Sequence, residues 1–457
     1  MIDDIILTHP NKEIYMQDKV TPRILPGFME LLPADQILFN DMYDKIRSVY
    51  ESFGFLPIDT PAIELSEVLL AKAGGETEKQ IYRFNKGDND LSLRFDLTVP
   101  LARYVAAHYN DLVFPFKRYH MSKVYRGERP QKGRFREFYQ CDIDIIGNEE
   151  LSLLYDAEMP VVIYHVFKKL GIGDFTIRIN NRKVLGGFFA AEGLSDKIEE
   201  ILRVIDKIEK IGRDAVIKEL VSIGVPEEKT EGIIGFITID GERKEMIAKL
   251  RALGIENEIF NTGVDELETV TDTMVMFGMP EENFKLDLSI ARGLDYYTGT
   301  VYETAINGHP EFGSVCSGGR YDNLTGYYTD KKLPGIGISI GLTRLFSQLR
   351  DHGLIAPQKG TMADVLVIPM DKETLPYAVS VANTFREAGI PSDVYYGEKG
   401  MKQKMKYAGR SGFPYAAVIG TEEMQSGSLA LKDLLGENGQ KTVSVSEAIT
   451  ILKERKD

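Results

Sequence analysis

The sequence predicts an α+β protein that folds as more than one domain. The chain has 457 residues, which exceeds one ordinary domain, so two or three domains are expected. Residues 116–147 contain two strand-like runs joined by a polar loop, which indicates an antiparallel pair. Residues 363–457 alternate strand-like and helix-like segments, which is typical of a small α/β domain.

The first 65 residues are expected to hold an irregular arm, one long helix and a broken strand. Residues 1–35 are irregular and contain several prolines. Residues 35–53 place apolar side chains at helical spacing, and Gly54 is positioned to end the helix. Residues 55–65 are strand-like but broken at Pro61.

A further strand and helix follow, and the composition then changes. Residues 91–95 alternate as a strand and lead into a helix start, with Thr98 as the cap and Pro100 in the first turn. From residue 195 onward, apolar side chains recur at helical spacing between lysines and glutamates. We therefore predict a helical insertion at residues 186–268.

The strand pair carries an unusual concentration of positive charge. Residues 117–136 hold eight Lys or Arg side chains and one acid, in a chain with 69 acidic and 55 basic residues. Such a segment in an acidic protein indicates an anionic ligand, and arginine binds phosphate oxygens through a planar fork. Arg126 can reach one face of the return strand, along which polar side chains alternate: Gln140, Asp142 and Asp144. We expect a phosphate-bearing ligand there, the alternative being a solvated basic hairpin.

Composition and charge exclude several classes of protein. No run approaches the ~20 apolar residues of a membrane span, and the N-terminus lacks a signal-peptide pattern. The two cysteines, Cys141 and Cys316, rule out a disulfide framework and argue against a metal cluster. A net charge of −14 argues against general nucleic-acid binding, so any such contact must be local. We expect a cytoplasmic protein that uses neither a membrane nor a protein-bound metal.

More strands are expected before a glycine-rich passage. They lie at 285–290, 300–306 and 314–317, and a strand-to-helix passage follows at 335–344. Its G-x-G-x-x-x-G spacing does not match a dinucleotide-binding fingerprint, which also needs an acidic residue that is missing here. We interpret its small residues as packing a strand against a helix, with Arg344 at the helix start.

Two short segments carry candidate chemistry. Residues 292–299 present a fixed cation beside two phenols in a loop between strands, although alone they would more simply be a structural hairpin with packed tyrosines. Paired glycines in residues 317–322 let the backbone approach another group closely, although an ordinary turn would use them too.

The end of the chain is predicted to form a linker followed by a separate domain. Residues 350–362 are the predicted linker, and residues 363–457 should form a mixed sheet with one hairpin. A basic helix in this domain contains Lys402, Lys404 and Lys406 beside Tyr407. Such a helix suits backbone phosphates and a stacked base, with a solvated helix face as the alternative.

Several segments resemble the class II aminoacyl-tRNA synthetases, and one resembles the histidyl-tRNA synthetase family in particular. Residues 35–61 resemble motif 1, a dimer-interface element. Residues 124–144 (VYRGERPQKGRFREFYQCDID) resemble motif 2, and residues 335–346 (GIGISIGLTRLF) resemble motif 3. Residues 291–303 (ARGLDYYTGTVYE) are similar to the signature of the histidine-specific members. The resemblance extends over residues ~20–457.

This resemblance implies the architecture and the reaction. Residues 1–349 would form a class II catalytic domain with an antiparallel sheet and the 186–268 insertion, and residues 363–457 an anticodon-binding α/β domain with a mixed sheet. Family members activate histidine with ATP, release pyrophosphate and transfer histidine to the 3′ end of tRNA(His). The implied partners are L-histidine, ATP with its Mg²⁺ and tRNA(His), bound by a cytoplasmic homodimer.

The resemblance also implies roles at the phosphates of ATP. Arg126 and Arg344 match the arginines that hold the α- and γ-phosphates. Glu128 and Arg134 match loop residues around ATP. Arg292 matches the signature arginine, which lies near the α-phosphate and substitutes for a metal ion's charge. Positioning and charge neutralisation suit this reaction, because displacement at phosphorus leaves little covalent chemistry to the protein.

A pocket for histidine needs an acceptor and a donor set across the ring, because neutral imidazole has one N–H and one bare nitrogen. The resemblance places Asp144 and Tyr297 on the ring. It places a second group around the α-amino end: Asp96, Leu97, Thr98 and Gln140, with Tyr296 and Arg292 nearby. Many bacterial members carry glutamate where this chain has Asp96 and Asp144. Thr98 is equally compatible with a role as helix cap only.

Contacts with tRNA are implied at both ends of the chain. Arg129 and Gln131 match positions that meet the acceptor end of tRNA, and Lys402 and Lys406 would meet its backbone in the last domain. Two other proteins share the fold: a regulatory subunit of ATP phosphoribosyltransferase and an RNA-sensing domain of a stress kinase. An anticodon-binding domain and Arg292 favour the ligase over the first, and the lack of a kinase segment favours it over the second.

Overall fold

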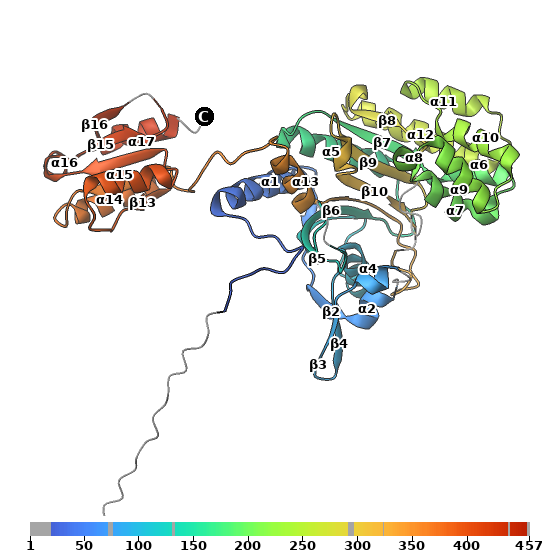
Figure 1. The fold of residues 1–457 in the computed structure, drawn as a ribbon, viewed down its shortest axis with the longest axis horizontal. Helices are drawn as coiled ribbons and strands as arrows, with labels where there is room; N and C mark the ends of the chain where they lie inside the picture. Colours follow the sequence, from blue (N-terminus) through green and yellow to red (C-terminus); the bar gives the residue numbers. More distant parts are fainter. Residues whose placement is uncertain are drawn as a thin grey trace, which may run out of the picture.

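The structure is a computed structural model that describes residues 20–71, 76–129, 133–290, 297–322, 324–436 and 439–454. Within these ranges the chain forms two domains, each with its own large sheet (Figure 1). No described helix is long and apolar enough to cross a membrane.

The first domain is built on a sheet whose described strands run in the order β1-β5-β6-β11-β10-β9-β7-β8. Its strands are β1 (Leu56–Pro57), β5 (Phe116–Tyr125), β6 (Glu137–Ile146), β7 (Phe175–Asn181), β8 (Phe284–Leu286), β9 (Thr300–Ile306), β10 (Cys316–Tyr321) and β11 (Gly335–Ile340). The central neighbours are antiparallel, as predicted, and the pairs at the two edges, β1 with β5 and β7 with β8, are parallel.

One face of this sheet is buried under helices. They include α1 (Pro33–Ser52), α5 (Leu154–Leu170) and α13 (Leu342–Asp351). The predicted helix after the N-terminal arm is thus confirmed as α1, whose apolar face packs with the strands in one core cluster. The hydroxyl of Tyr50 donates to the carbonyl of Cys141 at 3.0 Å, which ties α1 to β6. Because side chains alternate along a strand, the residues between the core positions must point to the other face.

A smaller sheet and short helices stand at one end of the domain. The strands are β2 (Ile63–Leu65), β3 (Arg83–Lys86) and β4 (Asn89–Leu93), and the β3–β4 hairpin projects from the domain in Figure 1. The helices are α2 (Ser66–Leu70), α3 (Glu76–Gln80) and α4 (Thr98–Ala107). The prediction that Thr98 caps α4 is wrong: Asp96 Oδ1 accepts the N–H groups of Thr98 and Val99 at 3.0 and 2.9 Å. A carboxylate just before the first helical N–H groups makes a good cap.

Helices fill the segment between β7 and β8. They are α6 (Arg182–Ala191), α7 (Ile198–Ile205), α8 (Ile208–Ile211), α9 (Arg213–Ser222), α10 (Glu227–Ile237), α11 (Arg243–Ala252) and α12 (Glu258–Met276). The helices α6 and α12 cross closely, because a Cβ at Gly187 would overlap the backbone of Phe260. The rings of Phe188 and Phe236 stack with centroids 3.8 Å apart.

The second domain has the predicted mixed sheet, with described strands in the order β13-β12-β14-β15-β16. These are β12 (Val365–Pro369), β13 (Ser392–Val394), β14 (Tyr415–Ile419), β15 (Ser428–Asp433) and β16 (Gln440–Ser444). Strand β12 pairs in parallel with both β13 and β14, and β15 pairs antiparallel with both β14 and β16. The helices are α14 (Leu375–Glu387), α15 (Met401–Arg410), α16 (Thr421–Ser426) and α17 (Val445–Glu454). The side chains of α14 and α17 share one core cluster and those of α15 another.

A buried ion pair joins α5 to β10 and yields a test of stability. Asp156 is fully buried and accepts hydrogen bonds from Arg320 Nη2 at 2.6 Å and from the Thr300 hydroxyl at 2.7 Å. We expect Asp156→Ala to lower the free energy of unfolding by about 3–5 kcal/mol, because it leaves a buried guanidinium uncompensated. Urea unfolding followed by circular dichroism measures this loss. Glu199→Ala, which breaks an exposed pair with Arg203, should cost less than about 1 kcal/mol, and equal losses would contradict the assignment.

Candidate active site

The open face of the first sheet carries a row of polar side chains at its centre. The three residues predicted to share a face, Gln140, Asp142 and Asp144, alternate with the core residues of β6. On β5, Arg118 lies opposite Asp144, and His120 lies opposite Asp142. These five side chains, three on β6 and two on β5, are called the polar floor. The register between the two strands brings them together.

Asp144 is held from two sides in this floor. Its Oδ2 lies 2.5 Å from Arg118 Nη2, and its Oδ1 accepts the hydroxyl of Tyr321 at 2.8 Å. All three side chains are buried, Arg118 completely. The sequence interpretation missed Arg118 and Tyr321. The alternation of residues 116–125 puts Arg118 in one set of side chains, but which residue faces it depends on a partner strand.

Glycines of β11 and β10 leave room for these side chains. A Cβ at Gly337 would overlap Asp144 Oδ1, and a Cβ at Gly335 would overlap the ring of Tyr321. A Cβ at Gly319 would lie 2.9 Å from the ring of Tyr297. The interpretation of 335–344 as small residues packing a strand against a helix is therefore wrong for Gly335 and Gly337, because β11 lies in the middle of the sheet and these positions face pocket side chains.

Burial shifts the proton affinities of the floor. It raises the pKa of Asp142 to about 7 and that of Asp144 to about 6, although the guanidinium of Arg118 lowers both. The negative charge of Asp96 raises both pKa values further. Burial and the Arg118 charge lower the pKa of His120 to about 4, while its Nε2 lies 2.9 Å from Asp59 Oδ1. The floor therefore holds two carboxylates that lose their protons less readily than ordinary aspartates.

Arg126 arrives on the predicted face. It follows the last residue of β5, and its Nε donates to the carbonyl of Phe95 at 3.2 Å. Its guanidinium carbon lies 4.4 Å from the ring centroid of Phe95 and 5.1 Å from that of Phe138. Because Phe138 precedes Gln140 by two residues on one strand, the cation lies over the same face as the polar floor.

Arg344 comes from the passage between β11 and α13. Its Nη2 donates to the carbonyl of Phe312 at 2.7 Å, which orients it within the first turn of the helix. The loop after Arg126 returns near this point, since a Cβ at Gly133 would lie 4.0 Å from Arg344 Nε. In the same loop Arg134 Nη1 lies 3.5 Å from Glu128 Oε2. The loop between β5 and β6 and the start of α13, which are distant in the chain, thus lie close together.

The residues expected around the α-amino group lie at the start of α4 and on β6. Gln140 Nε2 donates to Ser339 Oγ at 2.8 Å, and within the described residues its Oε1 has no hydrogen-bond partner. Asp96 and Thr98 are half-buried, and Leu97 is fully buried. Tyr297 packs in one small cluster with Tyr321.

The other expected residues lie outside the described residues, on the surface or in the interior. Arg292, Tyr296 and Gln131 lie outside the described residues. Arg129 is exposed at the beginning of the basic loop. On α15 the two lysines expected to meet tRNA, Lys402 and Lys406, are exposed. Lys404 is different: it is buried and donates to the carbonyl of Pro369 at 2.6 Å, so its expected part in a basic surface is wrong.

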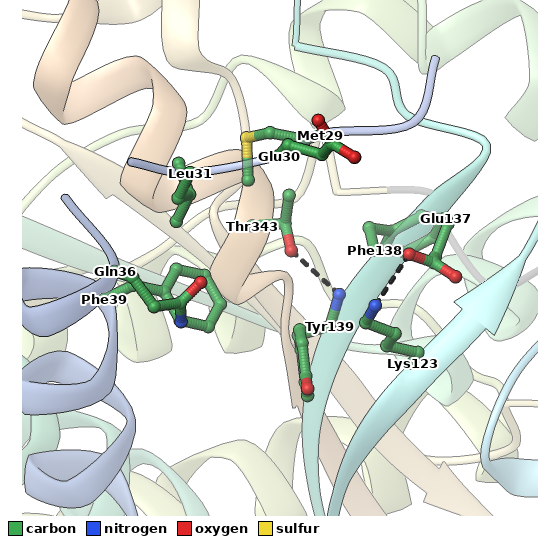
Figure 2. A pocket seen from close by; sticks show the side chains of 10 residues that line it. All are labelled: Met29, Glu30, Leu31, Gln36, Phe39, Lys123, Glu137, Phe138, Tyr139 and Thr343. Atoms are coloured by element: carbon green, nitrogen blue, oxygen red, sulfur yellow. Dashed lines mark hydrogen bonds and ion pairs between the residues drawn. The ribbon is translucent and has the colours of Figure 1, made fainter. Parts of the chain in front are cut away.

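A separate cavity of about 440 Å³ lies between the N-terminal arm, α1 and the opposite face of the β5–β6 pair (Figure 2). Lys123 and Glu137 form an ion pair of 2.7 Å on its wall, and Thr343 Oγ1 accepts the N–H of Tyr139 at 2.8 Å. Tyr139 alternates with Gln140 along β6, so this cavity and the polar floor are on different faces of the sheet.

The first domain combines an antiparallel sheet, a basic loop between two strands and an arginine where a strand leads into a helix. These features are those of the class II aminoacyl-tRNA synthetases, and the comparisons with known families place the chain in the same class. The family model for histidyl-tRNA synthetase matches residues 27–345, and the anticodon binding domain model matches residues 364–455.

Similar proteins and solved structures show which family within this class the chain belongs to. The chain is 58% identical to a histidine–tRNA ligase of Clostridium tetani, over 96% of this chain and 99% of the relative. It is 48% identical to one of Stenotrophomonas maltophilia, over 92% and 95%. The crystal structure of histidyl-tRNA synthetase from Nostoc sp. PCC 7120 superposes with a TM-score of 0.90 at 44% identity, covering 96% of this chain and 100% of that one. The chain belongs to the histidyl-tRNA synthetase family and is an ATP-dependent ligase.

The contact of Gly337 with Asp144 gives a direct test of the pocket. We expect Gly337→Ala to lower kcat/KM for histidine in ATP–pyrophosphate exchange by about 10- to 100-fold, because the added methyl group displaces the carboxylate. The KM for ATP should change little. Gly186→Ala on α6, where a Cβ would meet nothing within 4 Å, is the matched control. Unchanged histidine kinetics in the Gly337 variant would show that Asp144 need not keep its place.

Proposed function

We propose that histidine is activated on the polar floor of the first sheet and is then transferred to the 3′ end of tRNA(His). The observation that carries this assignment is the buried Asp144, fixed by Arg118 and Tyr321 within the floor that Arg126 overlies. A fixed carboxylate accepts a hydrogen bond from the imidazole N–H, and Tyr297 supplies the donor to the other ring nitrogen. Asp96, Leu97, Thr98 and Gln140 surround the α-amino group, with Tyr296 nearby.

In the first step a carboxylate oxygen of histidine attacks the α-phosphorus of ATP. A new P–O bond forms, the bond to the β-phosphate oxygen breaks, and pyrophosphate leaves with the electron pair. Arg126 and Arg292 neutralise charge at the α-phosphate, and Arg344 holds the γ-phosphate. Glu128 and Arg134, whose side chains lie 3.5 Å apart, border the nucleotide from the loop. In the second step a hydroxyl of the tRNA 3′ end attacks the histidyl carbonyl carbon, and AMP leaves.

Mg²⁺ enters this proposal with ATP. Within the described residues, no group of three or more His, Cys, Asp or Glu side chains comes together as a metal site. The ion is therefore proposed to arrive on the phosphates, and no step is assigned to a protein ligand of the metal.

The remaining assignments concern the assembly and the tRNA. We place the catalytic domain at 1–349, its insertion at 186–268 and the anticodon-binding domain at 363–457, in a cytoplasmic homodimer. Two-fold dimers are the commonest soluble oligomers, and the motif 1 resemblance of α1 supports this choice. Arg129 and Gln131 would meet the acceptor end of tRNA, and Lys402 and Lys406 its backbone.

The assignment is tested by ATP–pyrophosphate exchange without tRNA, with each amino acid in turn. We expect exchange with histidine alone, because only its ring pairs both a donor and an acceptor with the pocket. A structure described as an ATP phosphoribosyltransferase regulatory subunit/histidyl-tRNA synthetase superposes with a TM-score of 0.72 at 21% identity, which shows the shared fold alone. No histidine-dependent exchange by the folded protein would contradict the proposed binding of histidine on the polar floor.

The tRNA contact of α15 is tested separately. We expect Lys402→Glu with Lys406→Glu to lower kcat/KM for tRNA in charging by about tenfold or more and to weaken its salt dependence, because each lysine neutralises a phosphate. Histidine-dependent exchange should be unchanged. The double variant of Lys441→Glu with Lys453→Glu, at exposed positions on β16 and α17 of the same domain, changes the net charge by the same amount and serves as the control. Equal effects on charging from both would show that only net charge matters.

A further inference from the structure

One charged side chain inside the first domain, Arg118, has no evident structural reason to be buried there. It is completely buried, and it is among the largest side chains that the described chain hides from solvent. Arginine is almost never fully buried unless it is paired, because removing its charge from water is costly. Its Nη2 forms an ion pair with Asp144, and its Nη1 lies 3.5 Å from the Asp142 carbonyl. Within the described residues, neither its Nε nor its Nη2 has a hydrogen bond. An incompletely satisfied network of this kind adds little stability.

We propose that Arg118 is a positioning residue that determines specificity for histidine, by holding Asp144 ionised and aimed at the imidazole N–H. The inference rests on the proposed contact between Asp144 and the ring. Arg118 itself does not touch the substrate in this proposal and acts through Asp144.

The geometry allows Asp144 to serve both partners and a ligand. An ionised carboxylate has about four lone-pair sites. Arg118 forms an ion pair with Oδ2, and the Tyr321 hydroxyl donates to one site of Oδ1, which leaves acceptor positions for a substrate N–H. Because the two holders come from β5 and β10 on either side of β6 and β11, the carboxylate cannot turn without losing one of them.

The charges around Asp144 explain why a cation is needed. The titratable and charged groups that face it come from several elements: Arg118 and His120 from β5, Asp142 from its own strand, Tyr321 from β10 and Asp96 at the start of α4. Three of these groups, counting Asp144, are carboxylates, and burial raises the pKa of Asp144 to about 6 even beside Arg118. Without the guanidinium this pKa would rise further. A protonated Asp144 carries a donor where the imidazole N–H needs an acceptor.

The test is the pH dependence of histidine activation in the full chain. Steady-state ATP–pyrophosphate exchange would be measured from pH 5.5 to 9 for wild type, Arg118→Met, Arg118→Lys and Asp144→Asn, and for the double variant of Arg118→Met with Asp144→Asn. The substrate imidazole titrates identically in every case, so a difference between profiles belongs to the protein.

We expect Arg118→Met to raise the KM for histidine at pH 7 by about 30-fold, as when a buried charge loses its partner, with the KM for ATP nearly unchanged. Because removal of the cation raises the pKa of Asp144, activity should be lost at a higher pH as the pH falls. Arg118→Lys keeps the charge but not the planar fork. It should therefore restore the activity at low pH, the acid limb of the pH profile, more fully than it restores the KM for histidine. In the Asp144→Asn background, Arg118→Met should have little further effect.

A control separates this role from the general loss of a buried arginine. Arg243 on α11 is also buried and lies 3.2 Å from Glu281, far along the chain from the floor. Arg243→Met should lower the melting temperature without moving the acid limb or the KM for histidine. Melting curves of all variants show whether each is folded at the assay temperature, and Arg118→Lys carries the test if Arg118→Met is not.

The outcomes distinguish the two levels of the argument. If the Arg118 variants only melt earlier, as Arg243→Met does, and keep the wild-type KM and pH profile, Arg118 is structural and the inference is overturned while the role of Asp144 stands. If Asp144→Asn itself leaves the KM for histidine unchanged, the proposed ring contact fails, and the inference fails with it.

Discussion

The register between β5, β6 and β11 is the constraint on which the site depends. It sets Arg118 opposite Asp144, and Asp144 opposite Gly337, on three adjacent strands. A slip of one residue would turn the polar residues of β6 into the core and its isoleucines onto the open face. The core side opposes such a slip, because Ile143 and Ile145 are fully buried and Tyr50 anchors α1 to the carbonyl of Cys141.

The same sheet therefore separates stability from function by its two faces. The helix-covered face buries a continuous apolar cluster that extends from α1 to the helices between β7 and β8. The open face buries Arg118, Asp142 and Asp144, with Asp142 Oδ1 lacking a hydrogen bond among the described residues. Such groups cost stability unless a ligand completes their interactions. Functional sites commonly keep this kind of cost, and here the apolar face offsets it.

The residues proposed to bind histidine lie inside a strand, whereas those proposed to bind phosphates lie at the ends of a strand or helix. Asp144 and Gln140 lie inside β6, where the neighbouring strands fix the backbone. Arg126 follows the end of β5, and Arg344 lies in the first turn of α13. Recognition of a small ring requires fixed donors and acceptors, which strand interiors provide. Phosphates that enter and leave are better met by long side chains at the ends of elements, where the backbone has fewer constraints.

The sequence by itself determined what depends on neighbours along the chain. Alternation and charge in residues 116–147 predicted the hairpin and the common face of Gln140, Asp142 and Asp144, and helical spacing predicted α1. Only the tertiary structure decided which residues meet across the sheet. Tyr321 reaches Asp144 from 177 positions away in the chain, and no local pattern contains that pairing. The roles of Gly335 and Gly337 and the burial of Lys404 were interpreted wrongly for the same reason: each is set by packing against a distant segment, whereas periodicity reports only the element in which a residue lies.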